Sequence, residues 1–99
     1  MKRKIELSVA GEKITLEWDG MLHGYVVNLS RQEGRTCEGE SIPARYFLGR
    51  VGRHQRADGR LCWGNDRTGC VTDEVLCGTV EAAAERMILI FHKRHPRAC

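Results

Sequence analysis

The sequence predicts an α+β fold, in which one amphipathic helix near the C-terminus packs across a face of an antiparallel β-sheet of roughly four to six strands. Two observations support this prediction. The segment 79–95 repeats its apolar residues with the period of a helix, whereas the segments 4–9 and 13–19 alternate apolar and polar residues with the period of a strand. An apolar stripe on a helix needs a surface to cover it, and the apolar side of the strands provides one.

Two segments at the start of the chain predict a β-hairpin. Their apolar residues occupy every second position, as in half-buried strands: Ile5, Leu7 and Val9, then Ile14, Leu16 and Trp18. Ala10-Gly11 lies between the segments and suits a tight turn, because glycine tolerates positive φ. The polar residues that alternate with them, such as Glu6 and Thr15, are expected to remain in contact with water.

A third strand is predicted after the turn signal Asp19-Gly20. Its apolar residues again share one face, and they are Tyr25, Val27 and Leu29. We expect a further turn at Gln32-Glu33-Gly34 and then a weaker strand over Arg35–Glu40. Residues 1–40 therefore predict an antiparallel meander.

The segment that begins at residue 41 is predicted to form a short helix. Ser41 suits a helix N-cap and Pro43 suits the first turn. Apolar residues then follow at helical spacing, namely Ala44, Phe47, Leu48 and Val51. Gly49 and Gly52 weaken this helix by about 1 kcal/mol each relative to alanine. After it we expect a basic loop over 52–60, a strand at 61–63, a turn over 64–69 and a strand at 70–77.

The final helix has a predicted start and a predicted stop. Thr79 suits the N-cap, and Pro96 disfavours helical backbone at His95. The apolar stripe consists of Val80, Ala83, Ala84, Met87, Ile88 and Phe91. Leu89 and Ile90 widen this stripe, so the C-terminal half is either buried on a second side or forms a contact surface, such as a homodimer interface.

Size and composition indicate one globular domain spanning 1–99. Of the 99 residues, 41% are hydrophobic and 29% are charged, which is unlike a disordered segment. No run of about 18 apolar residues occurs, so we expect no membrane span. The basic start MKRKIELSV lacks the apolar region of a signal peptide, so we expect a cytoplasmic protein. Its five cysteines are then mostly reduced thiols, and their odd number agrees with this.

A run of arginines is the strongest functional signal. Residues 41–99 contain ten Lys/Arg against six Asp/Glu, and residues 45–60 contain a single acid, Asp58. Guanidinium groups bind phosphates and carboxylates, and the nearby aromatic rings offer stacking surfaces. Either this segment only keeps the domain soluble, or it is a binding surface. The candidate binding residues are Arg45, Arg50, Arg53, His54, Arg56, Arg60 and Trp63. Trp63 itself is either a core residue or an interface anchor.

Other chemistries have weaker support in the sequence. Gly49-Arg50-Val51-Gly52 matches the short G-x-x-G loop of KH-type RNA-binding domains. Cys62, Cys70 and Cys77 lack the Cys-x2–4-Cys spacing of zinc sites, so we expect no metal and no cofactor. His54 could meet Cys62 as a nucleophile pair, but no hydrolase, Walker A or metalloprotease motif is present. We therefore expect a protein that is not an enzyme.

The predicted layout resembles a known group of proteins. It consists of a β-meander, a basic middle and a strand that leads into one helix through Gly78-Thr79-Val80-Glu81-Ala82-Ala83-Ala84-Glu85-Arg86. The group comprises the small α+β binding proteins of phages and other mobile elements, including anti-CRISPR proteins. The resemblance implies an inhibitor that binds a partner protein or nucleoprotein complex and covers a functional surface. Direct nucleic-acid binding through the same arginines is the alternative.

Overall fold

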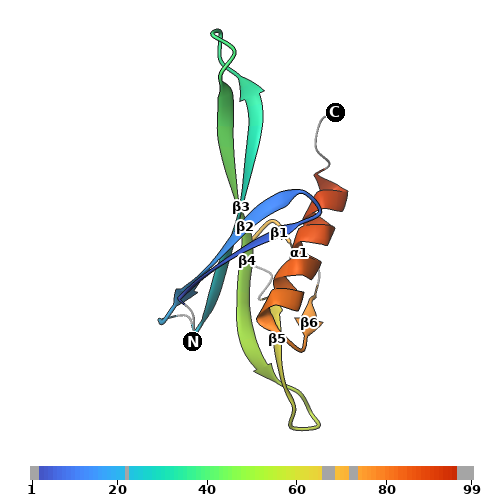
Figure 1. The fold of residues 1–99 in the computed structure, drawn as a ribbon. Helices are drawn as coiled ribbons and strands as arrows, with labels where there is room; N and C mark the ends of the chain where they lie inside the picture. The colour runs from blue at the N-terminus through green and yellow to red at the C-terminus, as the bar shows by residue number, and fades with distance from the viewer. Residues whose placement is uncertain (1–2, 22, 66–68, 72–73, 96–99) are drawn as a thin grey trace.

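The computed structural model describes residues 3–21, 23–65, 69–71 and 74–95 (Figure 1). They form one six-stranded antiparallel sheet, in which the strands lie in chain order, and one helix, α1 (Val80–Arg94). The strands are β1 (Lys4–Val9), β2 (Glu12–Asp19), β3 (Gly24–Arg35), β4 (Ser41–Gln55), β5 (Leu61–Asn65) and β6 (Leu76–Cys77). The predicted α+β class is confirmed, with α1 on one face of the sheet.

The first three strands follow the predicted alternation. Leu7 of β1 lies opposite Ile14 of β2, and Ile14 lies opposite Leu29 of β3, so the apolar residues share one face. The turn at Ala10-Gly11 is also confirmed, since both residues have positive φ, 52° and 78°. Residues 13–19 were predicted for the second strand, which begins one residue earlier, at Glu12.

Helix α1 begins as predicted. The Thr79 hydroxyl accepts a hydrogen bond from the Ala82 amide at 3.1 Å, which satisfies one of the donors left open at a helix start. The last helical residue is Arg94, and the predicted stop signal Pro96 lies outside the described residues. The buried residues of α1 are the predicted stripe: Val80, Ala83, Ala84, Met87, Ile88 and Phe91. Among the residues described, no helix is long and apolar enough to span a membrane.

The predicted middle helix is wrong, because residues 41–55 form the long strand β4. A bulge lets Leu48 and Val51 both be buried although they are three positions apart, whereas Phe47 of the same apolar pattern is 41% exposed. The pairing of β4 with β3 shifts between Val27 and Asn28, so that Gly49 and Phe47 face these two residues and Leu48 is the extra residue. Pro43 is tolerated because β5 pairs only with 51–55, so this part of β4 is an edge.

Two turns were also placed incorrectly. Strand β3 continues through the turn predicted at 32–34 and ends at Arg35, and the weak strand predicted over 35–40 is the turn that joins β3 to β4. The predicted loop at 52–60 is shorter, because β4 includes residues 52–55. Gly39 and Gly59 each have φ of +85°, which lets the chain reverse in the same way at both hairpin turns.

The end of the sheet departs from the prediction as well. The strand predicted at 61–63 extends to Asn65. Of the strand predicted at 70–77, residues 72–73 lie outside the described ranges, and among the others only Leu76–Cys77 is a strand. Within the turn predicted over 64–69, residues 66–68 lie outside the described part of the chain. The amides of Cys70 and Val71 donate to the carbonyls of Phe47 and Leu48, at 3.1 Å each, which holds this segment beside β4.

The molecule is elongated, with extents of 55 × 25 × 20 Å. Figure 1 shows why: the β3–β4 hairpin and the β4–β5 hairpin project from opposite ends of the body, which consists of the sheet centre and α1. The core lies between α1 and the central strands, where Leu16, Val27 and Leu29 are fully buried. The hairpin ends are the parts of the described chain that lie farthest from this core.

Candidate functional site

The predicted binding residues do not form a single loop. Most of them lie on β4, where alternation divides them between two faces of the sheet. Arg45 and Arg50 pair with Ser30 and Val26 on the face away from α1, whereas Arg53 shares the face of the buried Val51. The residues that the structure does bring together are Arg53, His54, Arg56, Arg60 and Trp63, all on the β4–β5 hairpin. We call these five residues the arginine hairpin.

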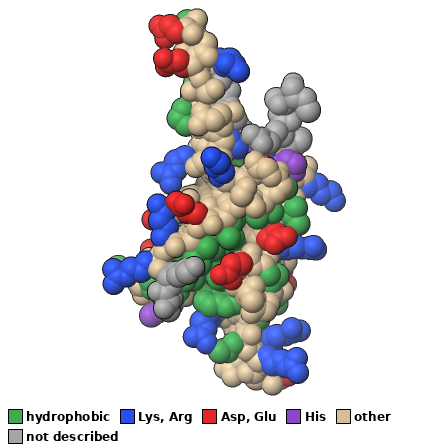
Figure 2. Space-filling view, viewed as in Figure 1, with side chains coloured by type: hydrophobic (Ala, Val, Ile, Leu, Met, Phe, Trp, Pro, Cys, Tyr) green, Lys and Arg blue, Asp and Glu red, His purple; other side chains and the backbone are tan. Residues whose placement is uncertain are grey.

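The turn of the arginine hairpin is held by its own backbone. The Arg56 amide donates to the Arg60 carbonyl at 2.8 Å, and the Gly59 amide donates to the Arg56 carbonyl at 2.9 Å. The single acid, Asp58, accepts from the Arg60 amide at 3.0 Å and lies 3.8 Å from the Arg60 guanidinium. This exposed ion pair contributes little to stability, so its main effect is to shape the turn. Figure 2 shows basic side chains gathered at this end of the molecule.

Three aromatic rings line the α1 side of the sheet next to these cations. Trp18 of β2 meets Tyr25 of β3 edge to face at 5.2 Å, and Tyr25 lies 5.9 Å from Trp63 of β5. The Arg53 guanidinium lies over Trp63 at 6.0 Å, at the outer limit of a cation–π contact. Trp63 is half-buried and packs against the core, which agrees with the first role considered for it, and its role as an interface anchor stays a prediction.

An open hollow of about 480 Å³ lies beside these rings. Its lining combines apolar surface with cationic and hydrogen-bonding groups, and the residues are Trp18, His23, Arg53, His54, Gln55 and Leu61. Leu61 is 56% exposed, which leaves apolar surface at the mouth of the hollow. This arrangement can hold an apolar side chain while arginines contact acids around it, which is the usual anatomy of an interface hot spot.

The weaker chemistries considered for this region do not match the geometry. The Gly49–Gly52 motif lies within β4 and not in a loop, so the KH-type interpretation is wrong. The Cys62 thiol points to the backbone carbonyl of His54, with a sulfur–oxygen distance of 3.5 Å, and not to the imidazole. Within the described ranges, no three His, Cys, Asp or Glu side chains gather as a metal site. The four cysteines in those ranges are free thiols, and Cys99 lies outside them.

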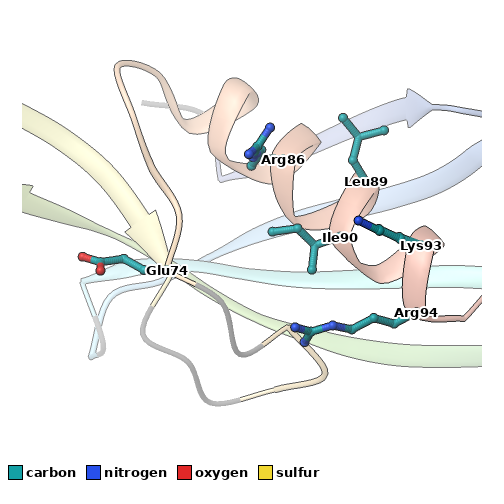
Figure 3. Close-up of a pocket in the computed structure, with 6 residues that line it drawn as sticks. All are labelled: Glu74, Arg86, Leu89, Ile90, Lys93 and Arg94. Atoms are coloured by element: carbon teal, nitrogen blue, oxygen red, sulfur yellow. The ribbon is translucent and has the colours of Figure 1, made fainter.

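A second hollow, of about 680 Å³, runs along the outer side of α1 (Figure 3). Its lining residues are Glu74, Arg86, Leu89, Ile90, Lys93 and Arg94. Figure 3 shows Ile90, Lys93 and Arg94 extending from the helix towards the side where Glu74 lies. Leu89 is 44% exposed and Ile90 is half-buried, so the wide apolar band of the helix is only partly covered by its own chain. We call this surface the helix groove.

Sequence reasoning missed a buried ion pair close to the helix groove. The Arg31 guanidinium of β3 donates to the Glu12 carboxylate of β2 at 2.6 Å, and both side chains are almost fully buried. Arg31 also lies over the Phe91 ring of α1 at 5.0 Å. The signal was present, because Glu12 and Arg31 continue the alternation that places Ile14 and Leu29 on the inner face.

A buried asparagine was missed for a different reason. The Asn65 side chain donates to the Val71 carbonyl at 3.2 Å and accepts from the Val75 amide at 3.1 Å. These bonds tie the segment before β6 to the end of β5. No local pattern predicts this role, because the partners are selected by the path of the chain in three dimensions.

The geometry thus defines a small α+β protein with a basic, aromatic-backed hairpin and a basic helix groove. No protein-family model matches the chain, and neither a curated protein nor a solved structure shows a significant match. Any functional conclusion therefore depends on these surfaces alone.

Proposed function

We propose that this chain is a non-enzymatic binding protein that uses the arginine hairpin to cover an acidic surface of a partner protein or nucleoprotein complex. This mode of action is that of the small phage-type inhibitors that its layout resembles. One observation carries the proposal. Three exposed arginines and His54 lie on a projecting hairpin that includes a single acid, Asp58, and this acid is bonded within the turn.

The arginine hairpin is preorganised for binding. The hairpin backbone is held by paired strands and two turn hydrogen bonds, so little conformational entropy is lost when a partner binds. Guanidinium groups can grip carboxylates or phosphates with two parallel hydrogen bonds. The hollow beside Trp18 provides an apolar anchor point next to these cations. Arginine and tryptophan are the residue types that most often dominate binding energy at interfaces.

The test is a comparison of three baits in quantitative affinity capture from nuclease-treated lysate. The first bait is the natural chain. The second carries Arg53→Glu, Arg56→Glu and Arg60→Glu. We expect the second bait to capture at least about tenfold less of a partner that the natural chain enriches, because like charges then face the acidic surface of that partner.

The third bait is a control with the same change in net charge. It carries Lys4→Glu, Lys13→Glu and Arg45→Glu, which are exposed residues on the face of the sheet away from α1. We expect it to capture the partner as well as the natural chain does. Equal capture by all three baits, or equal loss in the second and third, would refute the arginine hairpin as the binding surface.

Direct nucleic-acid binding remains a second candidate because of one observation. The basic element is a projecting two-stranded ribbon, and the major groove of B-DNA admits such a ribbon. If Arg53, Arg56 and Arg60 each contact a phosphate, a plot of the logarithm of the association constant against the logarithm of the salt concentration should have a slope of about −3. Fluorescence anisotropy of labelled DNA and RNA measures this slope. If no binding is measured at physiological salt, the nucleic-acid candidate is rejected and only the protein-partner proposal stands.

A further inference from the structure

Beyond Arg31, the hairpin between β3 and β4 extends past the neighbouring strands of the described chain. Strand β2 pairs with β3 only as far as Ser30, and β5 pairs with β4 only from Val51 onward. Residues 31–35 and 41–45 therefore form a two-stranded ribbon, which we call the arm, with a length of about 17 Å. An isolated two-stranded ribbon is marginally stable in water, and its open edges favour pairing with another surface.

The turn at the end of the arm contains two acids and has an apolar neighbour. Glu38 and Glu40 lie in this turn, the Arg35 guanidinium donates to the Gly39 carbonyl at 3.0 Å, and Ile42 is 44% exposed. The turn has the same hydrogen bonds as the arginine hairpin, since the Thr36 amide donates to the Glu40 carbonyl and the Gly39 amide to the Thr36 carbonyl. Figure 2 shows acidic side chains at this end of the molecule, opposite the basic end.

The helix groove has the complementary chemistry. Three cations surround Leu89 and Ile90, against a single carboxylate, Glu74. Like the arm, the groove has an exposed apolar residue next to charges, but of the opposite sign. A complementary interface can form between two such surfaces. Acidic groups on one meet basic groups on the other, and their apolar neighbours cover each other.

The arm cannot fill the groove of its own chain. The base of the arm is attached to the C-terminal end of α1 by a cluster of rings, in which Tyr46 lies 5.1 Å from Phe91 and Arg31 lies over the same ring. From this base the arm points away from the helix (Figure 1). The structure thus separates the two acids at the end of the arm from the basic groove, and a second copy of the chain can connect them.

We propose that two copies of this chain form a symmetric dimer in which the arm of each copy lies in the helix groove of the other. The arrangement is isologous, so the same contact occurs twice, and two-fold symmetry closes the assembly. Glu38 and Glu40 meet Arg86 and Lys93, while Ile42 covers Leu89. This dimer leaves the arginine hairpin exposed, so it is independent of the function proposed above.

The test uses two charge-reversed variants and their mixture. One variant carries Glu38→Lys and Glu40→Lys, and the other carries Arg86→Glu and Lys93→Glu. In size-exclusion chromatography with light scattering, the natural chain should be dimeric, and each variant should dissociate at least about tenfold more readily because like charges then meet at both contacts. Mixing the two variants should restore a dimer, because each reversed arm then meets a groove of opposite sign.

The control variant carries Arg56→Glu and Arg60→Glu, the corresponding positions of the other hairpin, and it should dimerise like the natural chain. A natural chain that is monomeric at about 100 μM would overturn the proposal, since Kd values well above this are too weak for a specific dimer. The proposal would also be overturned if the variants dimerise as tightly as the natural chain. The same holds if their mixture stays monomeric while both variants keep the circular dichroism spectrum of the natural chain.

Disulfide trapping provides a second measurement that does not depend on charge reversal. Cys37 is exposed at the end of the arm, so oxidation should link it to a cysteine introduced by Leu89→Cys in the groove of the other copy. Cys70 and Cys99 are first replaced by serine to remove competing thiols. Glu81→Cys, at the other end of α1, is the control and should give no linked dimer. Equal linking at both positions, or none at Leu89→Cys, would overturn the proposed docking.

Discussion

The pair of Glu12 and Arg31 is the most unusual feature at the scale of single residues. Their side chains are 0% and 3% exposed, and the guanidinium is held between a carboxylate and the Phe91 ring. Removing two charges from water is costly, and the attraction between them offsets that cost only while both are present. The pair thus connects β2, β3 and α1 at the point where the arm leaves the body.

The energetic role of this pair can be measured by a double-mutant cycle. We expect Arg31→Ala to lower the free energy of unfolding by about 3–5 kcal/mol, because Glu12 is then buried as an uncompensated charge. The double replacement Glu12→Leu with Arg31→Met should be close to neutral, since it removes both charges and retains the volume. Urea denaturation of the three proteins measures these differences.

The exposed pair of Lys4 and Glu6, 3.7 Å apart, is the control for the buried one. Lys4→Ala should change the unfolding free energy by less than about 1 kcal/mol, because surface pairs are screened by water. An Arg31→Ala variant as stable as Lys4→Ala would show that the buried pair is not important for the fold.

At the scale of elements, α1 depends on local signals that can be tested separately. The Thr79 side chain caps the first turn, Glu81 lies near its positive end, and His92, Lys93 and Arg94 lie in the last turn. We expect Thr79→Ala to lower the unfolding free energy by about 1 kcal/mol, because the Ala82 amide loses its acceptor. Thr79→Ser keeps the oxygen and should restore most of this stability. Equal losses in both variants in urea denaturation would argue against the cap.

Strand β4 shows how an element can contradict its local pattern. Ser41 and Pro43 resemble a helix start, and the apolar residues after them fit a helical stripe. Pairing with β3 determines the outcome instead, because residues 41–55 gain a partner along most of their length. The bulge opposite Val27 and Asn28 then shifts the alternation by one residue, which places Arg45 and Arg50 on the same face although they are five positions apart.

At the scale of the whole molecule, charge is separated along the long axis. The same turn geometry closes both hairpins, but one contains Glu38 and Glu40 and the other contains Arg56 and Arg60. A net charge of +3 conceals this separation. The two acids of one turn and the two arginines of the other lie at different ends of an elongated body, and the two proposals therefore concern different surfaces.

The shape also predicts how stability is distributed. In the Glu38→Lys and Glu40→Lys variant, where the arm is expected to have no partner, the amide hydrogens of Ile42, Ala44 and Arg45 should exchange at least about a hundredfold faster than those of Val27 and Leu29. The reason is that short ribbons open locally, whereas central strands open only with the whole fold. Hydrogen exchange measured by NMR tests this, and similar protection in both regions would contradict it.

The sequence by itself determined the elements whose signals are local. The bounds of α1, its cap at Thr79 and the faces of the first three strands follow from periodicity and from residues close together in the chain. These features depend on neighbours within a few positions, so the sequence contains what is needed to predict them. The five residues of the arginine hairpin were also identified from the sequence, although as part of a larger set.

Only the tertiary structure decided the features that depend on distant residues. Strand pairing made β4 a strand, its bulge placed Arg45 and Arg50 on one face, and packing against α1 brought Arg31 to Phe91. The path of the chain also set the arm beyond the ends of β2 and β5 and left Leu89 exposed along the helix groove. Each of these outcomes depends on which segments meet in space, and the free energy gained from that meeting exceeds the local preference of the segments involved.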